Sequence, residues 1–487
     1  MSETSRHHPG PSVSTASAGD TLTLFAFLWA VAAIFHVLGP SGRATQVIAN
    51  PTTLGISHAL LAICAIWLLA RPTRNVPLLL VAGLGLITAG LEAPILGNHW
   101  LVAAFVNLAL LLCVLGRARA GGIDRVRLAD VLLPLARWCL VLFYAFAAFA
   151  KLNSDFFDTA VSCSTFYFDE TVRSFGLVAP ATVGAGGLAN FLPVATAMTE
   201  LSVPVLLLIR RTRAFGVVLG LGFHSVVALD RVHPFIDFSA VLAALFLLFL
   251  PAQFASKAAG YLQGRGARLV ISWMAAAVVV LAAEWVGRNA VVVLVSVVGT
   301  WLLWYVLDAA LLLGVGIWLA RHRGQPLDQP FKLRGKGPIW LAAVPVLLVI
   351  NGLLPYVELR TGYAYTMYSN LRMVDGRSNH LIVRASLPLA GRQADLVKVV
   401  SSDDPGLAQY STYNYLLTWD SFRTYLAKHP GAAVTYERSG ERHVVKRASD
   451  DRELITSPPL LVRKLLAMRA VDGNDHARCQ DGFLPAL

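Results

Sequence analysis

A lysine stands at the end of a long apolar run, where its amine is placed to do chemistry. The run begins at Trp138 and ends at Lys151. It has the length and composition of a membrane helix, in which a charged amine is costly unless it is paired, reaches the interface or takes part in a reaction. A partly dehydrated lysine can lose its proton near neutral pH and act as a base. The alternative is that Lys151 marks the helix end and extends its amine to the membrane interface.

Other polar side chains occur in or beside apolar runs. Asn98 and His99 open the fourth run, Glu200 lies within the sixth, and His224 lies within the seventh. Lys151, His99 and His224 map to the same half of the membrane. Ionisable groups gathered at one depth are typical of a transport pathway or a reaction site, although a single membrane histidine is more often a packing residue. This group of residues therefore does not distinguish an enzyme from a transporter.

The loop after Lys151 alternates aromatic and acidic residues, beginning with Asp155, Phe156, Phe157 and Asp158. Aromatic residues in such a position are typical of a membrane interface. The acids could also hold Lys151 in an ion pair, which would keep the amine charged and argue against a base.

The composition indicates a polytopic membrane protein. Of 487 residues, 56% are hydrophobic and 14% are charged, whereas soluble domains carry roughly 25% charged residues. The net charge of +12 does not indicate a nucleic-acid partner, because the basic residues fall between apolar runs, where they direct membrane topology. Of the five cysteines, no pair has the spacing of metal ligands, and no metal site is expected.

Eleven apolar runs are candidate membrane spans, each of which needs about 20 residues. Several runs are short or interrupted, so we expect an all-α membrane protein with about nine to eleven transmembrane helices. The run at 290–320 is long enough to tilt or to contain a break. The runs lie at 22–38, 54–70, 76–96, 99–116, 131–151, 188–209, 214–230, 235–251, 269–286, 290–320 and 338–355.

Lysine and arginine residues are concentrated in alternate loops. The positive-inside rule then places the N-terminus in the cytoplasm and the segment after the last span outside, in a multi-pass protein of the inner or plasma membrane. The Lys151 end of its helix faces the same extracytoplasmic side. Cys163 and Cys479 would share that oxidising compartment and could form a disulfide.

The chain divides into four expected regions. A disordered cytoplasmic segment at 1–20 precedes a transmembrane core at 21–255 and additional transmembrane helices at 256–356. Residues 357–487 form a small extracytoplasmic α+β domain. Its predicted elements are strands at 380–385, 395–400, 433–437 and 443–446, helices at 418–426 and 460–468, and a hairpin turn at Ser439-Gly440.

Several of these segments together resemble a known family. The segment from Phe143 to Phe156 resembles the lysine-leucine-acid segment of the vitamin K-dependent γ-glutamyl carboxylases and of their bacterial relatives, the horizontally transferred transmembrane domain family. Asn98-His99-Trp100-Leu101 is similar to the family's Asn-His segment one helix earlier. Glu200 to Pro204 and then Phe223-His224 follow in the family's order. The resemblance covers roughly 20–255 and makes 21–255 a carboxylase-like core.

The chain also departs from the family pattern. Ala150 stands where the family segment can carry a second lysine. The tail is short compared with the large substrate-binding region of the animal enzymes. The resemblance therefore implies the reaction of the transmembrane core more firmly than it implies a protein substrate that is converted to a γ-carboxyglutamate protein.

The resemblance implies a reaction. Lys151 would deprotonate a reduced vitamin K-type naphthoquinol, either vitamin K or menaquinol, with O2 and CO2 as co-substrates. The resulting quinone-derived alkoxide would take the γ-proton of a glutamate side chain, and the carbanion would add CO2. Asn98 and His99 would orient the quinol, His224 would position the quinol or CO2, and Glu200 would belong to the same binding site.

The partners implied are the lipid bilayer, the quinol and a glutamate-containing peptide or protein. Two other functions remain open, because family membership alone does not determine activity. One is a membrane transporter or lipid- or quinone-binding protein that uses the same polar cluster. The other is a non-enzymatic membrane subunit.

Overall fold

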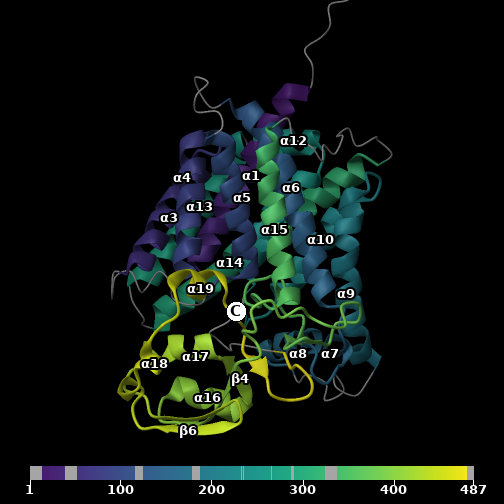
Figure 1. Ribbon diagram of the computed structural model, residues 1–487. Coiled ribbons are helices and arrows are strands. Elements are labelled where there is room, and N and C mark those ends of the chain that lie inside the picture. Colours follow the sequence, from purple (N-terminus) through teal and green to yellow (C-terminus); the bar gives the residue numbers. More distant parts are fainter. Residues whose placement is uncertain are drawn as a thin grey trace, which may run out of the picture.

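Helices make up most of the protein, and a small β-sheet lies at one end of the helical body, as Figure 1 shows for the computed structural model. The structure describes residues 14–38, 52–115, 124–177, 187–231, 233, 235–264, 266–286, 290–323 and 337–479.

Eight helices in the described ranges are long and apolar enough to cross a membrane, or nine if one bent pair counts as a span. Nine is the lower end of the expected range of nine to eleven, and eight is one below it. The eight are α1 (Ser14–Val37), α3 (Thr53–Ala70), α4 (Asn75–Glu92), α5 (Asn98–Leu115), α6 (Arg125–Ala150), α9 (Gly187–Leu208), α14 (Ala290–Arg321) and the run of η3 (Ile339–Ala342), α15 (Ala343–Leu353) and η4 (Leu354–Val357).

The other apolar runs also form helices, but these are short or bent. The helix α10 (Arg213–Val227) and the pair α11 (Ile236–Phe246) and η2 (Leu247–Phe249) have fewer residues than a usual span. The bent pair is α12 (Ala252–Gln263) and α13 (Ala267–Val286), which meet at 73°.

Two expectations about helix boundaries change. α14 continues through all of its 32 residues, so the break considered for 290–320 does not occur. The segment 1–20, expected to be disordered, overlaps α1, which begins at Ser14. Residues 1–13 lie outside the described part of the chain.

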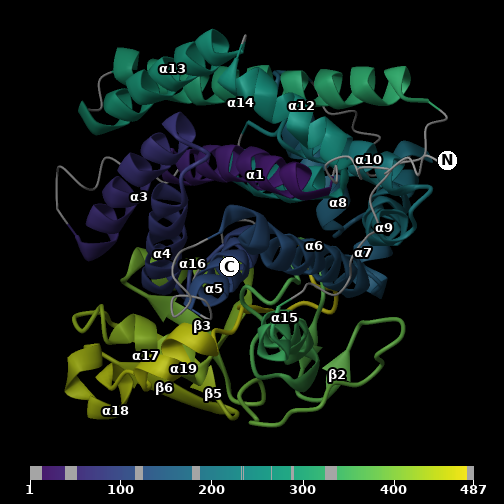
Figure 2. The same ribbon diagram turned by 90° about the horizontal axis from the view of Figure 1, so that it is seen from above.

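The most enclosed of the eight candidate spans is α1. It lies between α13 and α14 on one side and α5 and α6 on the other in the view of Figure 2. In α1, 83% of the most apolar stretch is buried, against 18% in α14. A helix that is apolar on all sides is stable in either setting, in contact with other helices or with lipid. The exposed apolar side chains of α14, including Leu294, Leu302 and Leu313, are placed to face lipid.

Lys151 is the C-cap residue of α6. The chain then forms two short helices, α7 (Ser154–Phe157) and α8 (Cys163–Ser174), at the end of the body that carries the C-terminal sheet (Figure 1). The Asn153 side chain accepts a hydrogen bond from the backbone N–H of Phe156 and so caps the start of α7.

The C-terminal region contains a five-stranded antiparallel sheet in the order β6-β5-β3-β4-β7, and its helices pack on a separate apolar core. The predicted strands at 395–400, 433–437 and 443–446 and the helix at 418–426 are confirmed, and the last helix is shorter than predicted. The elements are β1 (Met373–Val374), β2 (Arg377–Ser378), β3 (Leu396–Ser402), α16 (Pro405–Tyr413), β4 (Tyr415–Thr418), α17 (Trp419–Leu426), β5 (Val434–Arg438), β6 (Glu441–Val445), η5 (Ala448–Asp450), α18 (Arg452–Ile455), α19 (Leu460–Leu465) and β7 (Val471–Asp472).

The hairpin turn between β5 and β6 is also confirmed. Ser439 and Gly440 have φ angles of 52° and 82°. Positive φ at both central residues is what a tight hairpin with right-handed twist requires.

The strand predicted at 380–385 is wrong. His380 Nδ1 accepts hydrogen bonds from the backbone N–H groups of Ile382 and Val383, at 3.1 and 3.0 Å. Its Nε2 lies 2.8 Å from the carbonyl oxygen of Phe149. The side chain thus satisfies backbone donors that a strand would pair with a neighbouring strand. The segment forms isolated bridges only.

These contacts make stability depend on the charge of His380. Burial lowers the pKa of the imidazole, although the hydrogen bond to Phe149 acts in the opposite direction. The contacts of the neutral His380 imidazole therefore contribute fully to the free energy of unfolding above the pKa that histidine has in the unfolded chain, about 6.5. This contribution is lost as the pH falls through the lowered pKa of His380 in the folded protein. We expect His380→Gln to lose less thermal stability between pH 7.5 and pH 5 than the wild type, measured by unfolding in detergent. His443→Gln is the control, and an equal loss in all three proteins would contradict the expectation.

Candidate functional site

The amine of Lys151 lies inside the protein. The residue is 3% exposed. Its Nζ is 2.8 Å from Glu200 Oε2, an ion pair by distance that lacks the alignment of a hydrogen bond. The Nζ also donates to the carbonyl oxygens of Met367 at 3.3 Å and of Ala147 at 3.5 Å. The side chain therefore does not extend to a water-exposed interface, although its backbone stands at the helix end.

Helix periodicity explains how α6 supports this site. Tyr144, Ala147 and Lys151 are spaced by three and four residues, which places them on one helix face. Tyr144 and Ala147 are 2% exposed. Because Ala147 has a small side chain, the lysine chain can lie back along this face toward α9, which carries Glu200.

The segment 359–372, here called the strap, closes this end of the helical body. Asn153 Nδ2 donates to the carbonyl oxygen of Ser369 at 2.5 Å, and the backbone N–H of Tyr365 donates to Asn98 Oδ1 at 2.7 Å. Tyr365 is fully buried in the core of the helical body. Lys151 therefore lies beneath backbone contributed by a segment more than 200 residues away in sequence.

The strap holds an unusual backbone conformation. Tyr363, Tyr365, Tyr368 and Asn370 have φ angles of 35°, 61°, 50° and 54°. Left-handed backbone in such residues costs on the order of 1 kcal/mol each and persists only where surrounding contacts impose it. The contacts of the strap with Asn98, Lys151 and Asn153 are among those that impose it here.

His224 is buried between α6 and α11. Its Nε2 lies 2.5 Å from Tyr144 Oη, and its Nδ1 has no hydrogen-bond partner among the described residues. The ring of Phe238 lies against both histidines of the predicted site, with centroids 4.6 Å from His224 and 5.2 Å from His99. Phe143 packs edge-on against Phe238. Phe238 therefore links both histidines to the aromatic packing of α6.

His99 belongs to a line of alternating imidazoles and carboxylates. Its Nε2 is 3.0 Å from Asp237 Oδ2, which is 3.4 Å from His36 Nδ1. His36 Nε2 and His58 Nε2 are each 3.0 Å from Glu92 Oε1. The line joins α5, α11, α1, α4 and α3 at the end of each helix nearest the C-terminal region.

The predicted site residues thus divide into two groups. Lys151 and Glu200 contact each other directly, and Asn98 contacts the strap that covers them. His99 and His224 both pack against Phe238. The predicted quinol-orienting role of Asn98 competes with its hydrogen bond to Tyr365.

The acids after Lys151 bind groups other than the lysine. Asp155 Oδ2 accepts hydrogen bonds from Asn379 Nδ2 at 2.9 Å and from the backbone N–H of Ala477 at 2.7 Å. Asp158 accepts a bond from the N–H of Ala160 in the same loop. The carboxylate that pairs with Lys151 is therefore Glu200.

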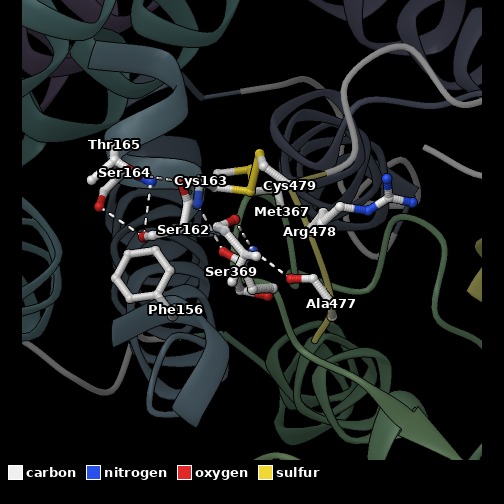
Figure 3. The surroundings of a disulfide bond; sticks show 12 residues. Phe156, Ser162, Cys163, Ser164, Thr165, Met367, Ser369, Ala477, Arg478 and Cys479 are labelled. Atoms are coloured by element: carbon white, nitrogen blue, oxygen red, sulfur yellow. Dashed lines mark hydrogen bonds between the residues drawn. A yellow bond between two sulfur atoms is a disulfide. The ribbon is translucent and has the colours of Figure 1, made fainter. Parts of the chain in front are cut away.

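The predicted disulfide between Cys163 and Cys479 is present. Figure 3 shows it joining α8 to the end of the C-terminal region, beside Met367 and Ser369 of the strap. The Asn370 side chain donates to the carbonyl oxygens of Val161 and Ala477 next to it. The disulfide and the two hydrogen bonds of Asn370 therefore hold α8, the strap and the end of the C-terminal region together.

We expect Cys479→Ser to lower stability by about 2–4 kcal/mol, because the crosslink closes a long loop. Thermal unfolding in detergent, with Cys64→Ser as the control, measures the change. Cys64 is a free cysteine of α3. A reducing agent should lower the stability of the wild type and not that of Cys479→Ser.

A cavity of about 250 Å³ lies between the α4–α5 connection and the C-terminal region. Pro94 and Ile95 line one side. Arg392, Lys428 and Arg463 contribute basic side chains to its lining, and Asp420 contributes an acidic one. The cavity is therefore lined by a net positive charge near the turn that leads to Asn98 and His99.

Sequence reasoning missed His36, His58, Asp237 and Tyr144. Each stands within an apolar stretch, and a polar residue in such a stretch is the same signal that identified Lys151. Their partners come from distant helices, so no local spacing could have paired them.

Comparisons of the chain with protein-family models, with curated proteins and with solved structures found no match.

Proposed function

We propose that the protein is an integral membrane enzyme that couples oxygenation of a vitamin K-type hydroquinone to proton abstraction and CO2 addition at a glutamate side chain. The observation that carries the proposal is the buried Lys151–Glu200 pair beneath the strap. It adds to the resemblance of the segments around Lys151, Asn98 and His224 to the carboxylase family. In this proposal Lys151 is the initiating base.

A base must first be neutral, and Glu200 provides a way to make it so. A proton could pass from the Lys151 amine to the Glu200 carboxylate, 2.8 Å away, once the two groups turn into the alignment of a hydrogen bond. In surroundings of low polarity the resulting neutral pair competes with the ion pair, because both charged groups lose hydration. The neutral amine can then take the proton of a quinol hydroxyl group.

The surroundings of the pair suit a lipophilic quinol and exclude water. The ring centroid of Phe156 lies 5.9 Å from the lysine amine, and Phe143 packs edge-on against Phe238 and Tyr365 in the helical body. Such aromatic surfaces are of the kind that pack against a flat ring. Asn153 and the strap close the end of the body. The quinol supplies, with oxygen, the strong base that the glutamate γ-proton requires, and such a base survives only where water is excluded.

His224 and His99 would hold the quinol oxygens and CO2. His224 shares a hydrogen bond with Tyr144, which keeps its ring in one orientation. His99 is held in the same way by Asp237. Groups oriented by a second partner bind and position substrates more accurately than mobile ones.

The acceptor would be an acidic peptide bound outside the membrane. Lys428 and Arg463, which line the 250 Å³ cavity, attract carboxylates, whereas Arg392 already binds Asp420. This arrangement agrees with an extracytoplasmic C-terminal region and a cytoplasmic N-terminus in the inner or plasma membrane.

The test is reconstitution of the purified protein in lipid with a naphthoquinol, oxygen, labelled bicarbonate and glutamyl peptides. We expect quinone epoxide and label in the peptide, both dependent on quinol and oxygen. Epoxide without label would support the oxygenase half alone. Neither product with any of several quinols would refute the proposal, and quinol binding without turnover would favour a quinone-binding protein.

A further inference from the structure

A second group of buried polar side chains lies outside the Lys151 site. It consists of His36 in the last turn of α1, His58 near the start of α3 and Glu92 at the end of α4. The two histidines are 1% exposed, and 5% of the Glu92 side chain is exposed. We call these three residues the imidazole-carboxylate cluster.

The three side chains converge on one point. His36 Nε2 and His58 Nε2 each lie 3.0 Å from the same oxygen, Glu92 Oε1. All three atoms lie within 4.8 Å of one another. Ligand atoms at about 2.1 Å from one ion are about 3.0 Å apart at the right angles of octahedral coordination and about 3.4 Å apart in a tetrahedral site. The separations of 3.0 Å from Glu92 Oε1 fall at the octahedral end of this range.

The tautomer of His36 also suits a metal ligand. Its Nε2 faces Glu92, and its Nδ1 faces Asp237 Oδ2 at 3.4 Å. A neutral imidazole has one N–H, so it can donate to only one of two carboxylates. A metal ion at Nε2 leaves the N–H on Nδ1 for Asp237, which is the carboxylate–histidine–metal arrangement of many metal sites.

Charge balance points the same way. Glu92 and Asp237 bring two carboxylates into the interior of an apolar helical body, among three imidazoles. A divalent ion bound by neutral imidazoles would balance the two carboxylate charges. The indole of Trp100 stacks on His36 with ring centroids 3.7 Å apart. Its buried N–H has no acceptor among the described residues.

We propose that His36, His58 and Glu92 bind one divalent first-row transition-metal ion, with Asp237 orienting His36. Two imidazoles and one carboxylate are a donor set suited to Zn²⁺ or Fe²⁺. Three protein ligands leave coordination positions for water or another small molecule. The site is separate from the Lys151–Glu200 pair, and the quinol reaction proposed above does not require it.

The experiment measures metal in the purified full-length chain. The protein, in detergent, is stripped with a chelator, loaded separately with Zn²⁺, Fe²⁺ and Co²⁺, and freed of excess ion. Elemental mass spectrometry should find about one metal ion per chain. The Co²⁺-loaded protein should show the visible absorption bands of Co²⁺ with nitrogen and oxygen ligands. Glu92→Gln and His58→Gln should each lower metal affinity at least about tenfold. His443→Gln, in the C-terminal sheet, should keep it.

Two results would overturn the proposal. One is a wild-type protein that holds no ion after loading. The other is equal binding by the wild type and by folded Glu92→Gln, since adventitious ions would not depend on this carboxylate. If one variant fails to elute as a single species, the other variant and the wild-type Co²⁺ spectrum still decide. Failure of the quinol assay alongside normal metal binding would refute only the proposed function.

Discussion

Replacing Lys151 by alanine is expected to lower quinol epoxidation by about 10²–10⁴-fold, the usual contribution of a general base. In the proposed site this amine contacts Glu200 and the strap and acts as the initiating base. Alanine also removes a buried charge, so the loss must be separated from misfolding. Epoxide formation per molecule of monodisperse protein in lipid is the measurement.

Lys151→Arg is the decisive control. Arginine keeps the positive charge that faces Glu200, but its guanidinium does not lose a proton in proteins. If the lysine acts as a base, the arginine variant folds and remains inactive. If the lysine only balances the charge of Glu200, the arginine variant retains activity and the base is refuted. Partial recovery of Lys151→Ala by small added amines would support the base directly.

The helical body could be predicted from the sequence because each helix is determined by a continuous apolar run of residues. Apolar runs of about 20 residues form helices wherever they contact lipid or other helices, and each run yielded one. The number of full spans was harder, since α10 and α11 are short and packed against neighbours. The composition of a run does not determine how far its helix extends across the membrane.

The site could be predicted only in part, because its contacts are distant in sequence. Lys151 and Glu200 were both identified as unusual, but their separation in sequence gave no reason to pair them. The nearer acids, Asp155 and Asp158, are engaged by other groups. The strap was also missed, because its buried tyrosines follow no helical or strand period and are held by Asn98 and Asn153.

Removing one member of the Lys151–Glu200 pair is expected to destabilise the protein strongly. Glu200→Gln leaves the Lys151 ammonium buried, 3% exposed, with only carbonyl oxygens nearby. An unpaired buried charge of this kind costs about 3–5 kcal/mol. Unfolding in detergent by heat or by a denaturing surfactant measures the loss. Arg173→Gln, whose side chain forms an exposed pair with Asp169, is the control and should change stability by less than about 1 kcal/mol.

The double variant Lys151→Met with Glu200→Gln separates the pair energy from the cost of each orphaned group. Two neutral side chains of similar length leave no buried charge, so most of the stability lost in Glu200→Gln should return. The double variant should nevertheless form no epoxide. Recovery of stability without activity would show that the pair is retained for its chemistry rather than for the fold. A double variant as unstable as Glu200→Gln would instead mean that packing, not charge, causes the loss.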